Sequence, residues 1–256
     1  TSTTGSITDS CAGALSGSLL TTSSVTGTVL DGANTVSSFN ATNTTSGNVT
    51  LTNTIATLTI TGINEDGTGN VSVTNVGNVT TSGAISTEGG TIDLIASGVD
   101  KVLTISASVA STGGNITYTA DNMTIGSTTN AGAGIATLQP FTAGVAINLG
   151  GADAAGVLGI TDGELDTITA SIIRVGKGDS GALSVSSAIS PLNSSVLSLI
   201  SGSTVSQAAA ISVGSLRVSS VGAVTLNSAN VVNSLAAAVS GSGNGFSFAR
   251  ATGGDI

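Results

Sequence analysis

The densest group of acidic side chains lies at Asp162, Glu164 and Asp166, where the carboxylates alternate along the chain. Two converging carboxylates carry out glycoside hydrolysis, and carboxylate oxygens are ligands that Ca²⁺ prefers. Most of the other acidic residues are scattered singly, and the chain has no histidine. The sequence therefore predicts no enzyme, no catalytic residues and no cofactor. No dedicated metal site is predicted, and adventitious cation binding near this acidic group is the alternative.

Two short motifs imitate known sites. The segment Gly178-Asp179-Ser180-Gly181 matches the surroundings of a protease's nucleophilic serine, but such a serine needs a base, normally histidine, to take its proton. The segment Gly150-Gly151-Ala152-Asp153 begins like the tandem calcium repeat of secreted solenoids but is not repeated. The first motif therefore indicates a turn, the second is not a calcium repeat, and a polysaccharide-active enzyme is the least favoured function.

Threonine pairs raise the possibility of a binding face, because ice-binding solenoids present Thr-x-Thr in register on every coil. The expected outward pairs are Thr50/Thr52, Ser72/Thr74, Asp93/Ile95, Thr117/Thr119, Ser184/Ser186 and Thr225/Asn227. The array is interrupted at Asp93/Ile95, and threonine is in any case common in strands. A binding module for carbohydrate, a host surface or ice is therefore the alternative to a structural role.

The composition favours strands that bury a narrow core. Only 7% of the residues are charged and 2% aromatic, whereas 39% are hydrophobic, and the mean hydropathy is +0.46. A disordered chain would lack the apolar residues needed to offset chain entropy. The net charge of −9 argues against a nucleic-acid partner, which requires clustered Lys and Arg. No apolar run is long enough for a membrane span, and the single cysteine, Cys11, allows no internal disulfide.

A five-residue pattern of glycine, any residue, apolar, mostly Ser or Thr, and apolar recurs along the chain. Its copies begin at Gly47, Gly69, Gly90, Gly114, Gly181 and Gly222, and subtraction of these numbers gives spacings of 22, 21, 24, 67 and 41. The last two spacings are close to three and two times the first three. Because each copy alternates apolar and polar residues, it predicts a half-buried strand. The fold class expected is all-β, a right-handed parallel β-helix (β-solenoid) with about 22 residues per coil.

A longer repeat supports this fold. At a shift of 196, which aligns Leu30 with Leu226 and Asn34 with Asn230, 14 of the 34 positions from 15 to 48 are identical without a gap. The shift is nearly nine times 22, which a sandwich of antiparallel strands would not explain. We therefore expect residues 1–256 to form a single continuous β-solenoid segment whose 196-residue repeat restarts near residue 200.

One segment departs from the pattern. Residues 150–172 concentrate charged side chains, and Thr161 or Asp162 can cap a helical turn there. We expect a short excursion from the coil that rejoins it at residues 172–175. In the turns, Asn48, Asn70 and Asn115 occupy equivalent places, so we expect them to stack in a column with side-chain amides bonding along the axis.

Parts of the chain resemble the giant filamentous-haemagglutinin-like proteins of bacteria. The resemblance rests on residues 149–176, with Gly156-Val157-Leu158-Gly159-Ile160-Thr161, on residues 35–51, and on residues 224–248, with Ser242-Gly243-Asn244-Gly245-Phe246. It implies secretion across a Gram-negative outer membrane, an extracellular or cell-surface location and a role in adhesion, aggregation or matrix. The function expected is therefore the structural or adhesive shaft of an extracellular filament or surface adhesin.

The partners follow from the solenoid geometry. Neither end of the sequence shows a polar cap, since Ile256 matches Ile60 at the shift of 196. Parallel coils leave unpaired backbone groups at each end, which act as a template for another chain. The expected partners are further coils of the same polypeptide or identical copies stacked end to end as a filament. A cell-surface or matrix ligand is a further candidate partner, and neither a nucleic-acid partner nor a membrane span is expected.

Overall fold

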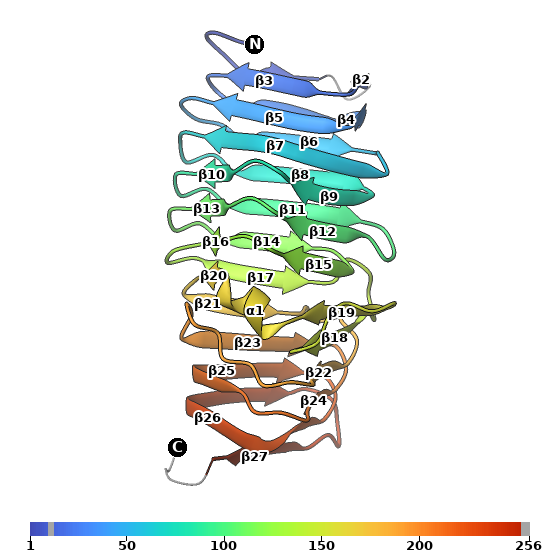
Figure 1. The fold of residues 1–256 in the computed structure, drawn as a ribbon, viewed down its shortest axis with the longest axis vertical. Helices are drawn as coiled ribbons and strands as arrows, with labels where there is room; N and C mark the ends of the chain where they lie inside the picture. Colours follow the sequence, from blue (N-terminus) through green and yellow to red (C-terminus); the bar gives the residue numbers. More distant parts are fainter. Residues whose placement is uncertain (10–12, 252–256) are drawn as a thin grey trace.

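The structure, a computed structural model, describes residues 1–9 and 13–251, so Cys11 lies outside the described residues. The chain forms a parallel β-solenoid of about 11 turns, in which successive turns lie roughly 21 residues apart (Figure 1). The prediction of an all-β parallel solenoid is therefore confirmed. Within the described ranges the α-helix is α1 (Asp162–Asp166), and no helix has the length and apolar character needed to cross a bilayer.

Face 1 is the ladder that runs along the whole rod. Val49 pairs with Val71 and Val71 with Ile92, so the equivalent strands of successive coils are hydrogen-bonded in parallel. In axial order its strands are β1 (Ile7–Thr8), β4 (Thr28–Val36), β6 (Val49–Asn53), β8 (Val71–Val76), β11 (Ile92–Ser97), β14 (Ile116–Thr119), β17 (Ile135–Gln139), β21 (Ile172–Val175), β23 (Val196–Ser201), β25 (Ser212–Ser220) and residues 234–239 of β26 (Val224–Val239).

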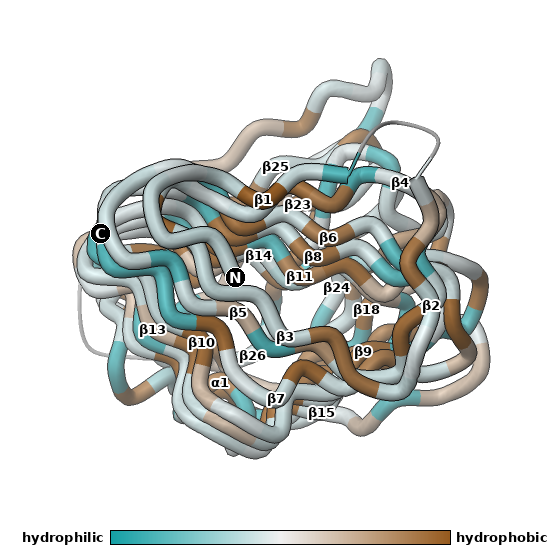
Figure 2. The backbone as a smooth tube through the Cα atoms, turned by 90° about the horizontal axis from the view of Figure 1, so that it is seen from above, coloured by the Kyte–Doolittle hydropathy of each residue, from teal (hydrophilic) through white to brown (hydrophobic). Residues whose placement is uncertain are grey.

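Two further faces complete each coil. Face 2 contains β2 (Ser16–Gly17), the start of β7 (Thr57–Glu65), β9 (Asn78–Thr81), β12 (Val102–Ile105), β15 (Asn122–Ile125), β19 (Val157–Ile160), β18 (Ala146–Leu149), β22 (Leu183–Val185), β24 (Val205–Gln207), the start of β26 and β27 (Phe246–Arg250). Face 3 contains β3 (Leu20–Ser24), β5 (Ser38–Asn43), the end of β7, β10 (Ile85–Thr87), β13 (Val109–Ser111), β16 (Thr129–Asn130) and β20 (Ile168–Thr169). Viewed along the rod, the coils superimpose around a common interior (Figure 2).

The interior is a narrow stack of branched aliphatic side chains. Val49 and Leu51 of one coil lie in register with Val71 and Val73 of the next, and all four are fully buried. Because neighbouring strands are only about 4.8 Å apart, each inward side chain packs against its equivalents above and below. The pattern of two apolar residues around one polar residue in each pentad is thereby accounted for.

The predicted turn column is present. The Asn48 Oδ1 accepts the backbone N–H of Asn70 at 3.0 Å, and the Asn70 Oδ1 accepts that of Thr91 at 2.8 Å. Asn115 repeats the contact with the N–H of Ile135 at 2.9 Å. The prediction of side-chain amides bonding along the axis is confirmed, and the partner on the next coil is a backbone N–H in each of these contacts.

One step on face 1 is much longer than the others, because Ala136 pairs with Ile173 of the next coil. The additional residues form a detour within the segment 150–172. After β18 the chain turns back through Gly150 and Gly156, both at positive φ, so that β19 pairs in parallel with β18. β19 also packs beside β15, which makes the axial order on face 2 β15, β19, β18 and β22. The detour therefore contributes an extra strand to the wall as well as helix α1.

The two copies of the long repeat share a hydrogen-bond network but lie on different faces. The Asn34 Oδ1 accepts the N–H of Leu15 at 2.8 Å, and the Asn230 Oδ1 accepts that of Ile211 at 2.9 Å. Asn34 lies at the end of a face 1 segment, whereas Asn230 follows a face 2 segment. Eight register steps along face 1 join Thr28 to Leu216, and β26 begins one face later. The expectation of nearly nine coils per repeat was therefore wrong, since one repeat corresponds to eight coils and one face.

Candidate binding groove on face 1

Two carboxylates of the detour, those of Asp153 and Glu164, accept backbone N–H groups along one edge of β15. β15 has β12 as its ladder partner, and on its other side the N–H of Met123 donates to the Asp153 Oδ2 at 2.9 Å. The N–H of Ile125 donates to the Glu164 Oε1 at 3.0 Å. These are N–H groups that the next coil would otherwise accept. β19 packs beside β15 without a ladder between them, so Asp153 and Glu164 take the place of the carbonyl groups that a hydrogen-bonded neighbouring strand would offer.

The helical turn and the loop that faces it use the remaining acids in the same way. Thr161 caps α1, and Glu164 closes the capping box by accepting the Thr161 N–H at 2.8 Å, as the sequence indicates. Asp162 accepts the N–H of Ser190 at 2.6 Å, and Asp166 accepts a backbone N–H from the same loop. In the part of the chain that the structure describes, no group of three or more His, Cys, Asp or Glu could hold a metal ion.

Asp153 lines a shallow hollow of about 380 Å³ together with Met123, Thr124, Ala152, Thr161 and Glu164. Burial raises the pKa of its carboxyl to about 6, and the negative charge of Glu164 adds to the rise, whereas the N–H groups of Gly159 and Met123 oppose it. The carboxylates of this hollow each accept two or more hydrogen bonds from the protein. These carboxylates are therefore used as hydrogen-bond acceptors within the wall of the solenoid.

The raised pKa of Asp153 predicts a pH-dependent stability. An acid whose pKa is higher in the folded than in the unfolded protein stabilises the fold below its unfolded value, near 3.8, and this contribution is lost as the pH rises through about 6. Between pH 4 and pH 7 the wild type should therefore lose about 1–2 kcal/mol of unfolding free energy relative to Asp153→Asn, after allowance for solvent screening. Urea denaturation at both pH values measures it.

Asp93→Asn is the control for this experiment, because it removes a carboxylate on the open surface of face 1. An equal difference between Asp153→Asn and the wild type at pH 4 and pH 7 would contradict the role assigned to burial of Asp153.

A fully buried carboxylate, that of Glu65, lies in a polar corner between faces 3 and 1. Ser24, Asn43, Glu65, Thr87 and Ser111 are in register there, and all are buried. Asn43 donates to the Glu65 Oε1 at 3.1 Å, the Oε2 has no partner among the described groups, and burial raises the pKa of Glu65. This corner is inside the wall and is closed to a ligand.

The protease-like segment is a turn. The buried Ser180 donates its N–H to the Lys177 carbonyl at 3.1 Å, and its Oγ accepts the Lys177 N–H at 2.9 Å. The Lys177 Nζ lies 3.2 Å from the Asp179 carboxylate. The hydroxyl is thus used inside the turn, in agreement with the sequence interpretation.

The outward Thr and Ser pairs fall on two faces. Thr50/Thr52, Ser72/Thr74, Asp93/Ile95 and Thr117/Thr119 are in register on face 1. The pairs Ser184/Ser186 and Thr225/Asn227 belong to the ladder of face 2, so their assignment to the same array was wrong. The reason is that the segment from Gly114 to Gly181 spans two coils and one face rather than three coils.

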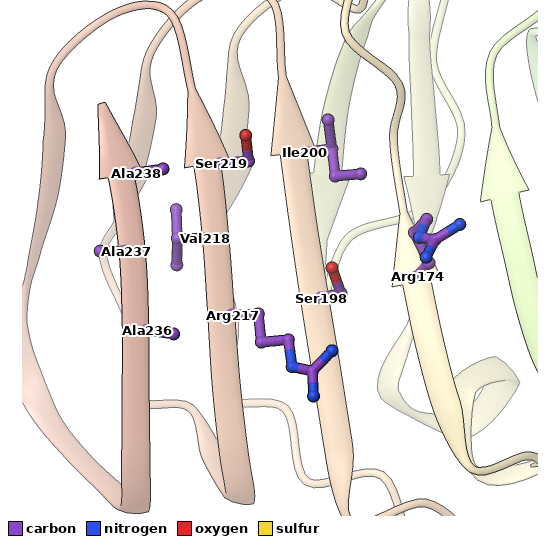
Figure 3. Close-up of a pocket in the computed structure, with 9 residues that line it drawn as sticks. All are labelled: Arg174, Ser198, Ile200, Arg217, Val218, Ser219, Ala236, Ala237 and Ala238. Carbon is purple, nitrogen blue, oxygen red and sulfur yellow. The ribbon is translucent and has the colours of Figure 1, made fainter. Parts of the chain in front are cut away.

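The face 1 array continues from Thr137 to Arg174, Ser198, Arg217 and Ala236. The last four of these positions border a shallow groove of about 310 Å³ (Figure 3). Its lining consists of Arg174, Ser198, Ile200, Arg217, Val218, Ser219, Ala236, Ala237 and Ala238. The groove brings two of the five basic residues of an acidic chain onto one apolar surface.

The sequence analysis missed this groove, although a signal for it was present. The strings Ile173-Arg174-Val175 and Leu216-Arg217-Val218 have the same pattern and lie two coils apart. Their register depends on a long coil from Ile173 to Leu197 and a short one from Leu197 to Leu216, which a uniform period does not give.

Comparison of the chain with family models, curated proteins and solved structures finds no match.

Proposed function

We propose that this β-solenoid is the structural and adhesive shaft of an extracellular bacterial filament or surface adhesin of the filamentous-haemagglutinin-like kind. The observation that carries the proposal is the ladder of face 1, which continues from Ile7 to Leu235 even past the detour. A continuous ladder gives a stiff rod, and the detour leaves the rod intact. The proposed location, outside a Gram-negative cell, rests on the resemblance of residues 149–176 to such proteins.

The side chains that could do chemistry support a non-enzymatic role. Asp153, Asp162, Glu164 and Asp166 each accept backbone N–H groups that belong to the wall or its loops. Carboxylates engaged in this way hold the detour against the coils. This role accounts for the acidic group without a reaction.

The proposed partners are further coils of the same polypeptide or identical copies stacked end to end. Residues 234–239 of β26 have β25 as their ladder partner, whereas β5, their counterpart in the other copy of the long repeat, pairs on both sides, with β3 and β7. Phe246 and Val231, in the same terminal coil, are 40% and 51% exposed. Among the described residues this ladder has no partner on its other side, and such a ladder beside exposed apolar side chains is a surface on which another coil can stack.

End-to-end stacking predicts concentration-dependent rods. Sedimentation velocity and negative-stain electron microscopy of the wild type should show oligomers that lengthen in steps of about 50 Å, the height of about 11 coils. Ala237→Asp should reduce this growth, because Ala237 is in register with the buried Val218 and a carboxylate there would enter the apolar column.

Asn233→Asp adds the same charge at an exposed position of the same strand and is the control. A monomer that persists at high concentration, or equal growth of the wild type and Ala237→Asp, would overturn the stacking of copies.

A further inference from the structure

Arg174 and Arg217 lie two coils apart in the outward array of face 1. Arg174 is in register with Ser198, and Ser198 with Arg217. Since neighbouring coils are about 4.8 Å apart, the two Cα atoms are separated by about 10 Å along the rod axis. The result is a linear track of a guanidinium, a hydroxyl and a second guanidinium.

Neither guanidinium group has a partner among the residues that the structure describes. Across residues 1–9 and 13–251, neither side chain donates a hydrogen bond or forms an ion pair, and the groove lining contains no acidic residue. The Arg174 Nε is in addition buried without a partner. A buried N–H of a charged group is normally bonded, so the described part of the chain leaves this donor unsatisfied.

The rest of the lining fits an extended chain of alternating polar and apolar character. Ser198 and Ser219 supply hydroxyls, and Ile200, Ala236 and Ala238 supply a small apolar surface, whereas the side chains of Val218 and Ala237 belong to the inward positions of their strands. In Figure 3 the side chains of Ala236 and Ala238 are short enough to leave the track open beside Arg217. Arginine matches carboxylate geometry with two parallel hydrogen bonds, which favours carboxylates as the charged groups of the ligand.

We propose that this groove binds an extended acidic polysaccharide, with carboxylates at Arg174 and Arg217 and sugar hydroxyls at Ser198 between them and at Ser219 beside Arg217. The proposal does not depend on the shaft function, because the groove is present in a single chain. Two cations about 10 Å apart suit a polymer with sparse negative charge. Double-stranded DNA carries one charge per about 1.7 Å, and the net charge of −9 would repel it. The lining also has no aromatic side chain on which a base could stack.

Isothermal titration with oligogalacturonate, an oligomer of carboxylated sugars, tests the proposal on the full chain. Binding should be measurable at low ionic strength and should weaken in about 0.3 M NaCl, because salt screens exposed charges. Arg174→Gln and Arg217→Gln should each reduce the affinity roughly tenfold, the usual size of a charge-assisted hydrogen bond. Arg174→Lys keeps the positive charge but not the planar guanidinium that gives two parallel hydrogen bonds, so its affinity should lie between those of the wild type and Arg174→Gln.

Lys101→Gln is the matched control, since it removes a positive charge from a different part of the rod. Neutral maltoheptaose and single-stranded DNA are the control ligands, and thermal unfolding checks that each variant folds. No binding of oligogalacturonate, an affinity that the arginine substitutions do not change, or equal loss in Lys101→Gln would overturn the proposal. Equal affinity for single-stranded DNA would replace it with a non-selective polyanion surface.

Discussion

Replacement of Gly90 by alanine should destabilise the solenoid by about 3 kcal/mol or prevent its folding, because an added Cβ has no space between the coils. A Cβ on Gly90 would overlap the carbonyl oxygen of Gly69 in the preceding coil, and one on Gly69 would overlap that of Gly47. The obstacle is backbone, which cannot rotate away as a side chain can. Neither Gly69 nor Gly90 has a positive φ, so crowding rather than conformational freedom explains the glycine.

Gly178→Ala is the control for this prediction, because a Cβ there meets nothing within 4 Å and the residue has no positive φ. Urea denaturation followed by circular dichroism measures the unfolding free energy of both variants. A loss below about 1 kcal/mol in Gly90→Ala would show that the coils can separate locally to admit a methyl group. It would also remove the steric reason for the first position of the pentad.

The pentads made the fold predictable, because their positions have separate physical causes. The apolar third and fifth positions fill the core, and the glycine lets the coils approach at the corner. The asparagine at the second position accepts an N–H from the next coil. These requirements are local in sequence and recur along the rod, so a pattern of glycine, asparagine and valine is sufficient to predict parallel stacking.

The positions of residues after the detour could not be predicted from that pattern. A uniform period assigns Leu183 and Val224 to face 1, but the long step between Ala136 and Ile173 places them on face 2. Each coil ends where the chain reaches its hydrogen-bonding partner on face 1, and the number of residues between such partners differs from coil to coil. The arginine groove depends on this variable register, and for that reason the sequence analysis did not find it.

The acidic detour illustrates a different limit. Alternating carboxylates at Asp162, Glu164 and Asp166 are compatible with catalysis, cation binding or capping, and the sequence does not reveal what faces them. The partners are the N–H groups of Ile125, Ser190 and Leu192, which come from segments distant in the sequence. Only the doubling back of β19 brings these groups together, so the outcome required the three-dimensional path of the chain.

Replacement of Asn53 by alanine should cost about 3–4 kcal/mol, since it removes a fully buried amide that completes a corner of the wall. The Asn53 Oδ1 accepts the N–H of Val36 at 2.8 Å, and the Nδ2 donates to the Val36 carbonyl at 3.1 Å. The Nδ2 also donates to the Asn75 Oδ1 at 3.0 Å, which continues the ladder to the next coil. Alanine would leave the N–H and carbonyl of Val36 buried without these partners. Chemical denaturation measures the loss.

Asn48→Ala gives the comparison, because the exposed Asn48 also bonds to the next coil but water can replace its amide. Its expected cost is below about 1 kcal/mol, so the losses of unfolding free energy at the two asparagines should differ several-fold although both bond along the rod axis.

A double-mutant cycle between Asn53 and Asn75 then separates the ladder bond from the corner bonds. Asn75 bonds to Ile55 as Asn53 bonds to Val36: its Oδ1 accepts the Ile55 N–H at 3.1 Å, and its Nδ2 donates to the Ile55 carbonyl at 2.9 Å. A coupling of at least about 0.5 kcal/mol is expected if the amides act as a ladder, whereas strict additivity would mean that each corner is stabilised on its own.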